Sequence, residues 1–136
     1  MPKKRRTPQE RQKAYQHKDK ATYSTRLANT PLFSLSHIDP NHCVTTCNQE
    51  DKAAFADTLR KLAQLSWSDI TTSGRHQLGF ELIPVTQCRC RLPQPFIDTK
   101  KYHVFRFHGK KAMGGIRNDN ILYIVFLDPT FQVYKH

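Results

Sequence analysis

The sequence predicts an α+β domain, with one main helix packed on an antiparallel β-meander and a disordered basic arm at the N-terminus. Apolar residues recur at helical spacing between residues 50 and 66, and the apolar period changes to two after residue 80. The first 30 residues contain almost no aliphatic side chains. At 136 residues and 15.9 kDa the chain suits one domain with a tail. We therefore expect an arm over 1–30 and a single α+β domain over 31–136.

The arm carries most of the positive charge. The formal net charge is +11, and residues 1–30 hold nine basic and two acidic side chains, hence +7. Residues 31–136 hold thirteen basic and nine acidic side chains, hence +4. So few apolar groups cannot offset the entropy cost of ordering the arm, which predicts disorder. The run Lys3, Lys4, Arg5 and Arg6 suits a nuclear localisation patch or a solvated tail that helps to hold RNA, and we favour the tail.

The main helix is predicted over 50–66. Its apolar stripe consists of Phe55, Leu59, Leu62 and Leu65. Acidic residues at the start and basic residues nearer the end suit the helix dipole. Two capping pairs are possible, Thr46 with Gln49 or Asn48 with Asp51. A second short turn is predicted over 67–70, and the apolar face of the helix is expected to cover the sheet.

The meander is predicted from period-two segments separated by turn residues. These segments are Phe80–Val85, Tyr102–Phe107, Lys111–Arg117, Ile121–Leu127 and Phe131–His136. Alternation places Tyr102, Arg106 and His108 on one face of the second strand and the phenylalanines on the other. Residues 121–127 are apolar on both faces, which predicts a central strand. Residues 91–101 contain two prolines and predict a loop.

Composition excludes several classes of protein. Hydrophobic residues make up 38% of the chain, and the longest apolar run, 121–127, is far too short to span a membrane. No apolar stretch follows the basic start, as a secretory signal requires. We therefore expect a cytoplasmic protein, and the net charge makes nucleic acid the expected partner.

A cationic segment lies between Asp98 and Asp119. It contains no acidic residue, and its aromatic side chains suit base stacking while its cations suit phosphate binding. The residues that we expect to bind RNA here are Lys100, Lys101, His108, Lys110 and Lys111. The alternative interpretation is a solvated basic face of the sheet without a ligand.

A catalytic set for RNA strand cleavage is predicted from strand phase. In a meander, Tyr134 and His136 can share a face with Arg106 and Arg117. Cleavage through the 2′-hydroxyl needs a base, an acid and cations around the phosphate, and imidazole and guanidinium groups supply these without a metal.

Two further residues have a functional and a structural interpretation. His76 lies in a glycine-flanked loop and is either a proton carrier or a loop histidine without a task. Glu81 points from the first strand of the meander and is either a base or a solvated salt-bridge partner.

The four cysteines, Cys43, Cys47, Cys88 and Cys90, allow a structural zinc site, with His37 and His42 near the first pair. Neither spacing is that of the usual zinc knuckle, and the favoured interpretation is four ordinary thiols. We expect no metal or other cofactor.

The carboxy half resembles toxins of the RelE/ParE superfamily. The resemblance is carried by Phe105–Arg117, by Phe126–Pro129 with the ending Tyr134–His136, and by the outline of residues 67–81 upstream. It covers residues 45–136 and leaves out the arm. It implies a toxin that cuts messenger RNA, commonly on the ribosome, and that a cognate antitoxin neutralises. It places the catalytic roles on Glu81, Arg106, Arg117, Tyr134 and His136, and additional roles on His76 and Lys111.

The expected function is thus a metal-independent endoribonuclease toxin. Its partners would be RNA, the ribosome and an antitoxin, with no membrane partner. The alternative is a non-catalytic RNA- or ribosome-binding basic module, with or without a stabilising zinc ion, that uses the arm and the sheet for their charge alone.

Overall fold

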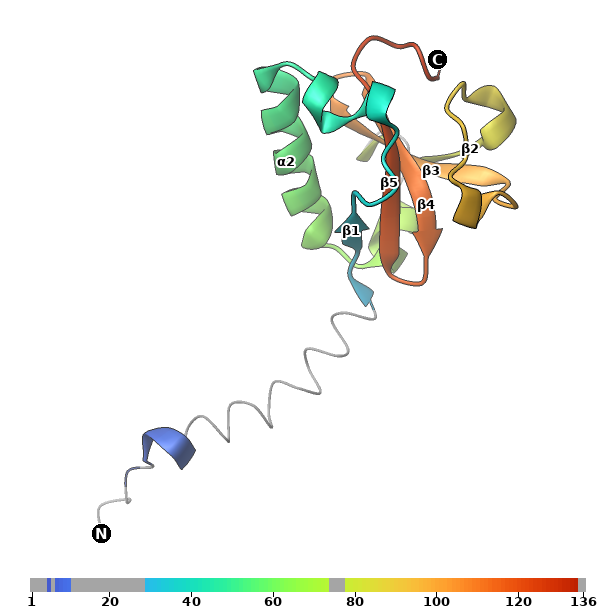
Figure 1. The fold of residues 1–136 in the computed structure, drawn as a ribbon. Coiled ribbons are helices and arrows are strands. Elements are labelled where there is room, and N and C mark those ends of the chain that lie inside the picture. The colour runs from blue at the N-terminus through green and yellow to red at the C-terminus, as the bar shows by residue number, and fades with distance from the viewer. Residues whose placement is uncertain (1–4, 6, 11–28, 74–77, 135–136) are drawn as a thin grey trace.

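The computed structural model describes residue 5 and residues 7–10, 29–73 and 78–134. It confirms the α+β class, with a five-stranded sheet packed against the helices α2 and α3 (Figure 1). The helices are α2 (Gln49–Ala63) and α3 (Trp67–Thr72). The strands are β1 (Leu32–Ser34), β2 (Glu81–Pro84), β3 (Lys101–His108), β4 (Lys111–Asn118) and β5 (Ile121–Asp128).

The strands lie in the order β1-β5-β4-β3-β2. From β2 to β5 each strand pairs antiparallel with the next, which is the predicted meander. Strand β1 has no counterpart among the predicted strands. It pairs parallel with β5 at the sheet edge, with Leu32 opposite Ile121. It has only three residues and is partly exposed, so it lacks the alternation that marks a half-buried strand.

The start of α2 shows which capping pair is formed. The Asn48 side chain accepts a hydrogen bond of 2.8 Å from the backbone N–H of Asp51, which is the second predicted alternative. The helix ends at Ala63, earlier than predicted. Ser66 begins α3 instead, accepting the backbone N–H of Asp69 at 3.0 Å.

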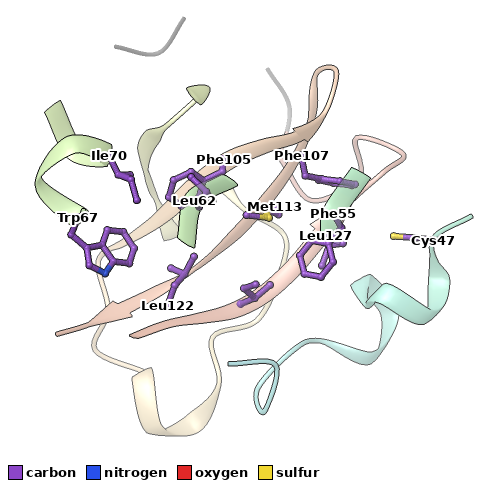
Figure 2. Close-up of a cluster of buried hydrophobic side chains, with 11 residues drawn as sticks. Cys47, Phe55, Leu62, Trp67, Ile70, Phe105, Phe107, Met113, Leu122 and Leu127 are labelled. Carbon is purple, nitrogen blue, oxygen red and sulfur yellow. The ribbon is translucent and has the colours of Figure 1, made fainter. Parts of the chain in front are cut away.

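The sheet has a core on each face. The helix-side core joins α2 and α3 to the sheet through Phe55, Leu62, Trp67, Phe105 and Leu127, among others (Figure 2). The loop-side core lies on the opposite face, where residues 85–96 and 133–134 cover side chains such as Tyr102, Val125 and Phe126. β5 contributes Leu122, Ile124 and Leu127 to the helix-side core and Val125 and Phe126 to the loop-side core, which confirms that it is covered on both faces. It is not the central strand, because the order of the sheet places β4 in the middle and β5 second from the edge.

The predicted last strand is not formed in its described part, 131–134. Tyr134 makes only an isolated antiparallel bridge with Cys88. The buried Asp128 carboxylate accepts the backbone N–H groups of Gln132 and Tyr134 at 2.7 and 3.0 Å. These bonds, with the left-handed backbone of Phe131 at φ 58°, turn the chain away from β5.

No helix in the described ranges is both long enough and apolar enough to cross a membrane. Most of the predicted arm lies outside the described residues, including Lys3, Lys4 and Arg6, and Arg5 is exposed.

Candidate functional site

A histidine and a buried carboxylate meet where α2 begins beside the β3–β4 hairpin. The Nδ1 atom of His108 lies 2.7 Å from Oδ1 of Asp51, and the Nζ atom of Lys111 lies 2.9 Å from the same oxygen. The Asp51 side chain is 3% exposed, whereas that of His108 is 41% exposed. A buried carboxylate therefore fixes one edge of an imidazole whose other edge remains accessible.

A β-bulge brings His108 to this position. Strand alternation predicts His108 on the same face as Tyr102, which lies in the loop-side core. The pairing of β3 with β4 shifts register between Arg106 and His108. Because an extra residue in one strand reverses the facing of those that follow, His108 contacts α2 on the helix side instead.

The charge on Asp51 is maintained by its two partners. Burial raises the pKa of the Asp51 carboxyl, but the hydrogen bonds from His108 and Lys111 and their positive charge outweigh burial, so its pKa lies below the usual value. The ionised Asp51 carboxylate accepts a hydrogen bond from the N–H at Nδ1 of His108. The Nε2 atom of the same ring is then left for proton transfer.

A hollow of about 220 Å³ lies beside this pair. Its cationic and polar lining comes from Lys61, Arg106 and His108, and its apolar lining from Leu62, Leu78 and Phe107. Thr58 of α2 also lines it and donates a hydrogen bond of 3.1 Å to the carbonyl oxygen of Phe107, which holds the helix to β3 next to His108. A phosphate with one attached sugar or base fits the chemistry of this lining.

Arg106 has no ion pair or side-chain hydrogen bond within the described residues. Arginine donors are usually satisfied by a carboxylate, by a backbone carbonyl or by a ligand. The Arg106 guanidinium is thus available to an anion that enters the hollow.

A second hollow, of about 380 Å³, lies elsewhere, between residues 37–40 and 91–94. It contains His37, whose ring packs edge-on against Phe96 with centroids 5.4 Å apart. Its carboxylate, Asp39, is engaged by the Asn41 backbone and the Cys90 thiol. Within residues 29–73 and 78–134, no ion pair couples His37 to an acidic side chain, so the hollow beside His108 has the better chemistry for proton transfer.

The predicted catalytic residues do not all converge. The Arg117 guanidinium lies 4.3 Å above the centroid of the Trp67 ring, on the helix side, and its Nε donates to the Asp119 carbonyl. Tyr134 packs against the loop-side core. The expectation that Tyr134 shares a face with Arg117 is therefore wrong, because the turn at Asp128 directs the chain to Cys88 on the other side of the sheet.

The remaining predicted site residues are dispersed or lie outside the described ranges. His76 and His136 lie outside them. Glu81 begins edge strand β2 opposite Val104 and is half-buried. Of the predicted RNA-binding lysines, Lys100, Lys101 and Lys110 are exposed, whereas Lys111 is bound to Asp51.

The cysteines do not form one four-thiolate site. Cys47 lies in the helix-side core and Cys90 in the loop-side core, and all four cysteines are free thiols. Within residues 29–73 and 78–134, no three or more histidine, cysteine or acidic side chains gather as metal ligands would.

Asp51, Thr58 and Lys61 were not among the predicted site residues, and Asp51 was predicted only as part of the helix start. A usable signal was present, since Asp51, Phe55, Thr58 and Leu62 follow one another at helical spacing. A carboxylate on the buried stripe of a helix requires a partner from another element.

Comparisons of the chain with models of protein families, with curated proteins and with solved structures found no match.

Proposed function

We propose that the protein is a metal-independent endoribonuclease whose reaction centre is the hollow beside His108. The observation that carries this proposal is the 2.7 Å hydrogen bond between His108 and buried Asp51, next to a hollow lined by Lys61 and Arg106. This reaction centre shares only Arg106 with the catalytic set predicted from the sequence. The proton-transfer role predicted for His136 is assigned to His108 instead.

The proposed reaction needs only side chains and the RNA itself. The Nε2 atom of His108 takes the proton of a ribose 2′-hydroxyl, whose oxygen bonds to the neighbouring phosphorus. The bond from phosphorus to the 5′-oxygen breaks, and the imidazolium returns a proton to that oxygen. Arg106 and Lys61 balance the charge that accumulates on the phosphate oxygens, and Asp51 stabilises the imidazolium as it forms.

A narrower form of the proposal names the biological setting. The resemblance of residues 105–117 and 126–136 to RelE/ParE toxins supports a cytoplasmic toxin that cuts messenger RNA on the ribosome. It also supports an antitoxin as the inhibitory partner.

The test of the proposal is cleavage of end-labelled RNA by the full chain, with and without ribosomes and a chelator. We expect chelator-resistant fragments, lost in His108→Ala and reduced in Arg106→Ala. His42→Ala and Arg89→Ala remove a histidine and an arginine outside the hollow and serve as matched controls. Fragments that persist undiminished in His108→Ala would refute the assignment of the reaction centre.

A second candidate is a non-catalytic RNA- or ribosome-binding module. It is favoured by the charge distribution, since residues 1–30 carry +7 of the net +11. It predicts RNA binding by the full chain that weakens steeply as salt rises, with no cut products under any condition and no loss of binding in His108→Ala.

A further inference from the structure

We propose that Gly79 is a positioning residue that fixes the side chain of Arg106 at the hollow. The inference rests on the proposed function for its choice of ligand, a phosphate. Gly79 lies just ahead of β2. It does not contact the phosphate itself but packs against the aliphatic stem of Arg106.

The register of the sheet places the two residues opposite each other. Glu81 of β2 pairs with Val104 of β3 in an antiparallel ladder. In an antiparallel ladder, the residue two positions before Glu81 lies opposite the residue two positions after Val104. Gly79 therefore faces Arg106. The chain enters β2 at this point with Gly79 in the left-handed region, at φ 64°.

The packing leaves no room for a side chain at residue 79. A Cβ on Gly79 would lie 2.6 Å from Cγ of Arg106 and 2.9 Å from its Cβ and Cδ. These distances are far inside van der Waals contact, so the first three side-chain carbons of Arg106 lie directly against the glycine backbone. An alanine here would push the stem, and with it the guanidinium, out of its present position.

This contact has a functional consequence because no charged partner among the described residues holds the Arg106 guanidinium. Its guanidinium has no ion pair within the described part of the chain, and a free arginine loses considerable rotamer entropy when it binds a ligand. Packing of the stem against Gly79 supplies part of that ordering before the ligand arrives, which favours binding.

A second glycine provides a comparison. Gly109, in the β3–β4 turn, also has a left-handed backbone, at φ 60°, but a Cβ there would meet no atom within 4 Å. Alanine at either residue therefore strains the backbone to a similar degree, and only alanine at residue 79 collides with Arg106.

The experiment is a double-mutant cycle on the full chain, with inorganic phosphate as the probe and NMR titration as the readout. We expect Gly79→Ala and Arg106→Ala each to weaken phosphate binding by roughly tenfold, typical of a lost charge-assisted hydrogen bond. In the Arg106→Ala background, Gly79→Ala should have no further effect, whereas any effect of Gly109→Ala should persist. Gly79→Asn, which tolerates a left-handed backbone better, replaces Gly79→Ala if the alanine variant does not fold.

The outcomes separate this inference from the proposed function. Equal losses from Gly79→Ala with and without the Arg106 side chain would overturn it, as would phosphate binding that Arg106→Ala does not weaken. Non-additive phosphate binding in a chain that cuts no RNA would support the positioning role and refute the nuclease. If the chain does cut RNA, the cleavage rate of Gly79→Ala should fall by roughly 10²-fold, as expected for a misplaced catalytic group.

Discussion

The Nδ1 atom of His108 lies 2.7 Å from Oδ1 of Asp51, although 57 residues separate them in the chain. Two local features create this relationship. The Asn48 cap begins α2 so that Asp51 lies in its first turn, and the bulge in β3 turns His108 toward the helix. The pair joins helix to sheet at the point where the proposed chemistry takes place.

Replacing Asp51 by Asn should separate this pair's electrostatic role from its packing. The amide is almost isosteric but cannot stabilise an imidazolium, so we expect RNA cleavage to fall roughly 10²- to 10⁴-fold. The fold should lose roughly 1–3 kcal/mol, because Lys111 loses its charged acceptor. Rates on labelled RNA and urea unfolding measure the two effects. Asp57→Asn, an exposed aspartate of the same helix, is the control, and equal cleavage by both variants would contradict the assignment.

The same carboxylate predicts a loss of stability in acid. The pKa of Asp51 is lowered in the folded protein, so near the unfolded value the unfolded chain binds more protons than the folded one. Stability that Asp51 contributes above about pH 4 is therefore lost as the pH falls below it. Asp51→Asn should lack this part of the acid transition, which urea midpoints measured between pH 5 and pH 2.5 would show.

His103 predicts a second, separate pH dependence. Its ring lies among aromatic neighbours, with centroids 6.0 Å from Trp67 and 5.7 Å from Phe80. Its buried Nδ1 has no hydrogen-bond partner among the residues that the structure describes. Burial, assisted by the charge of Arg117, lowers the pKa of His103 to about 4. Between about pH 6.5 and pH 4 the unfolded chain binds the extra proton, so stability falls as the pH falls through this range.

The variant His103→Phe removes this titration. We expect the wild-type protein to lose about 1–2 kcal/mol more than His103→Phe between pH 6.5 and pH 4, a value reduced from the full linkage because the ring is partly exposed. Other groups titrate alike in both proteins, so the difference between their urea unfolding curves isolates His103. Parallel curves would show that its burial does not resist protonation.

Asp128 should control the C-terminal turn. Its carboxylate accepts two backbone N–H groups, so we expect Asp128→Ala to cost roughly 2–4 kcal/mol and Asp128→Asn, which keeps one acceptor, less. The Arg89 N–H donates to the Val133 carbonyl at 2.9 Å. Its hydrogen exchange should accelerate in Asp128→Ala, and unchanged protection of this amide would show that the turn is held by other contacts.

The four thiols should differ widely in reactivity. Hydrogen bonds from the backbone and side chain of Thr45 lower the pKa of Cys43, whereas burial raises the pKa of Cys88 to about 11 and that of Cys90 to about 12. Since the thiolate is the reactive form, each unit by which a pKa is raised lowers the thiolate fraction by roughly tenfold. Iodoacetamide at pH 7.5 should therefore modify Cys43 first, and Cys88 and Cys90 at least roughly 10²-fold more slowly. Peptide mapping measures the order, denatured protein provides the control, and equally rapid modification of Cys90 would contradict it.

Local patterns predicted much of the fold. The apolar stripe of α2, the alternation along β3 and the doubly apolar run of β5 are properties of consecutive residues, and each follows from burying apolar surface at a fixed period. The strand β1 escaped prediction because it owes its existence to pairing with β5, 89 residues further on at Leu32 and Ile121, rather than to its own sequence.

Periodicity and composition along the chain already specify the class of the fold, the order of the meander and the accumulation of cations around residues 100–117. Which of these groups meet depends on contacts between residues far apart in the chain. One bulge moved His108 to the helix side, and one carboxylate, Asp128, turned Tyr134 toward Cys88 and away from Arg117. Both changes depend on hydrogen bonds that satisfy buried polar groups, and such bonds are set by the surrounding packing and leave no periodic trace in the sequence.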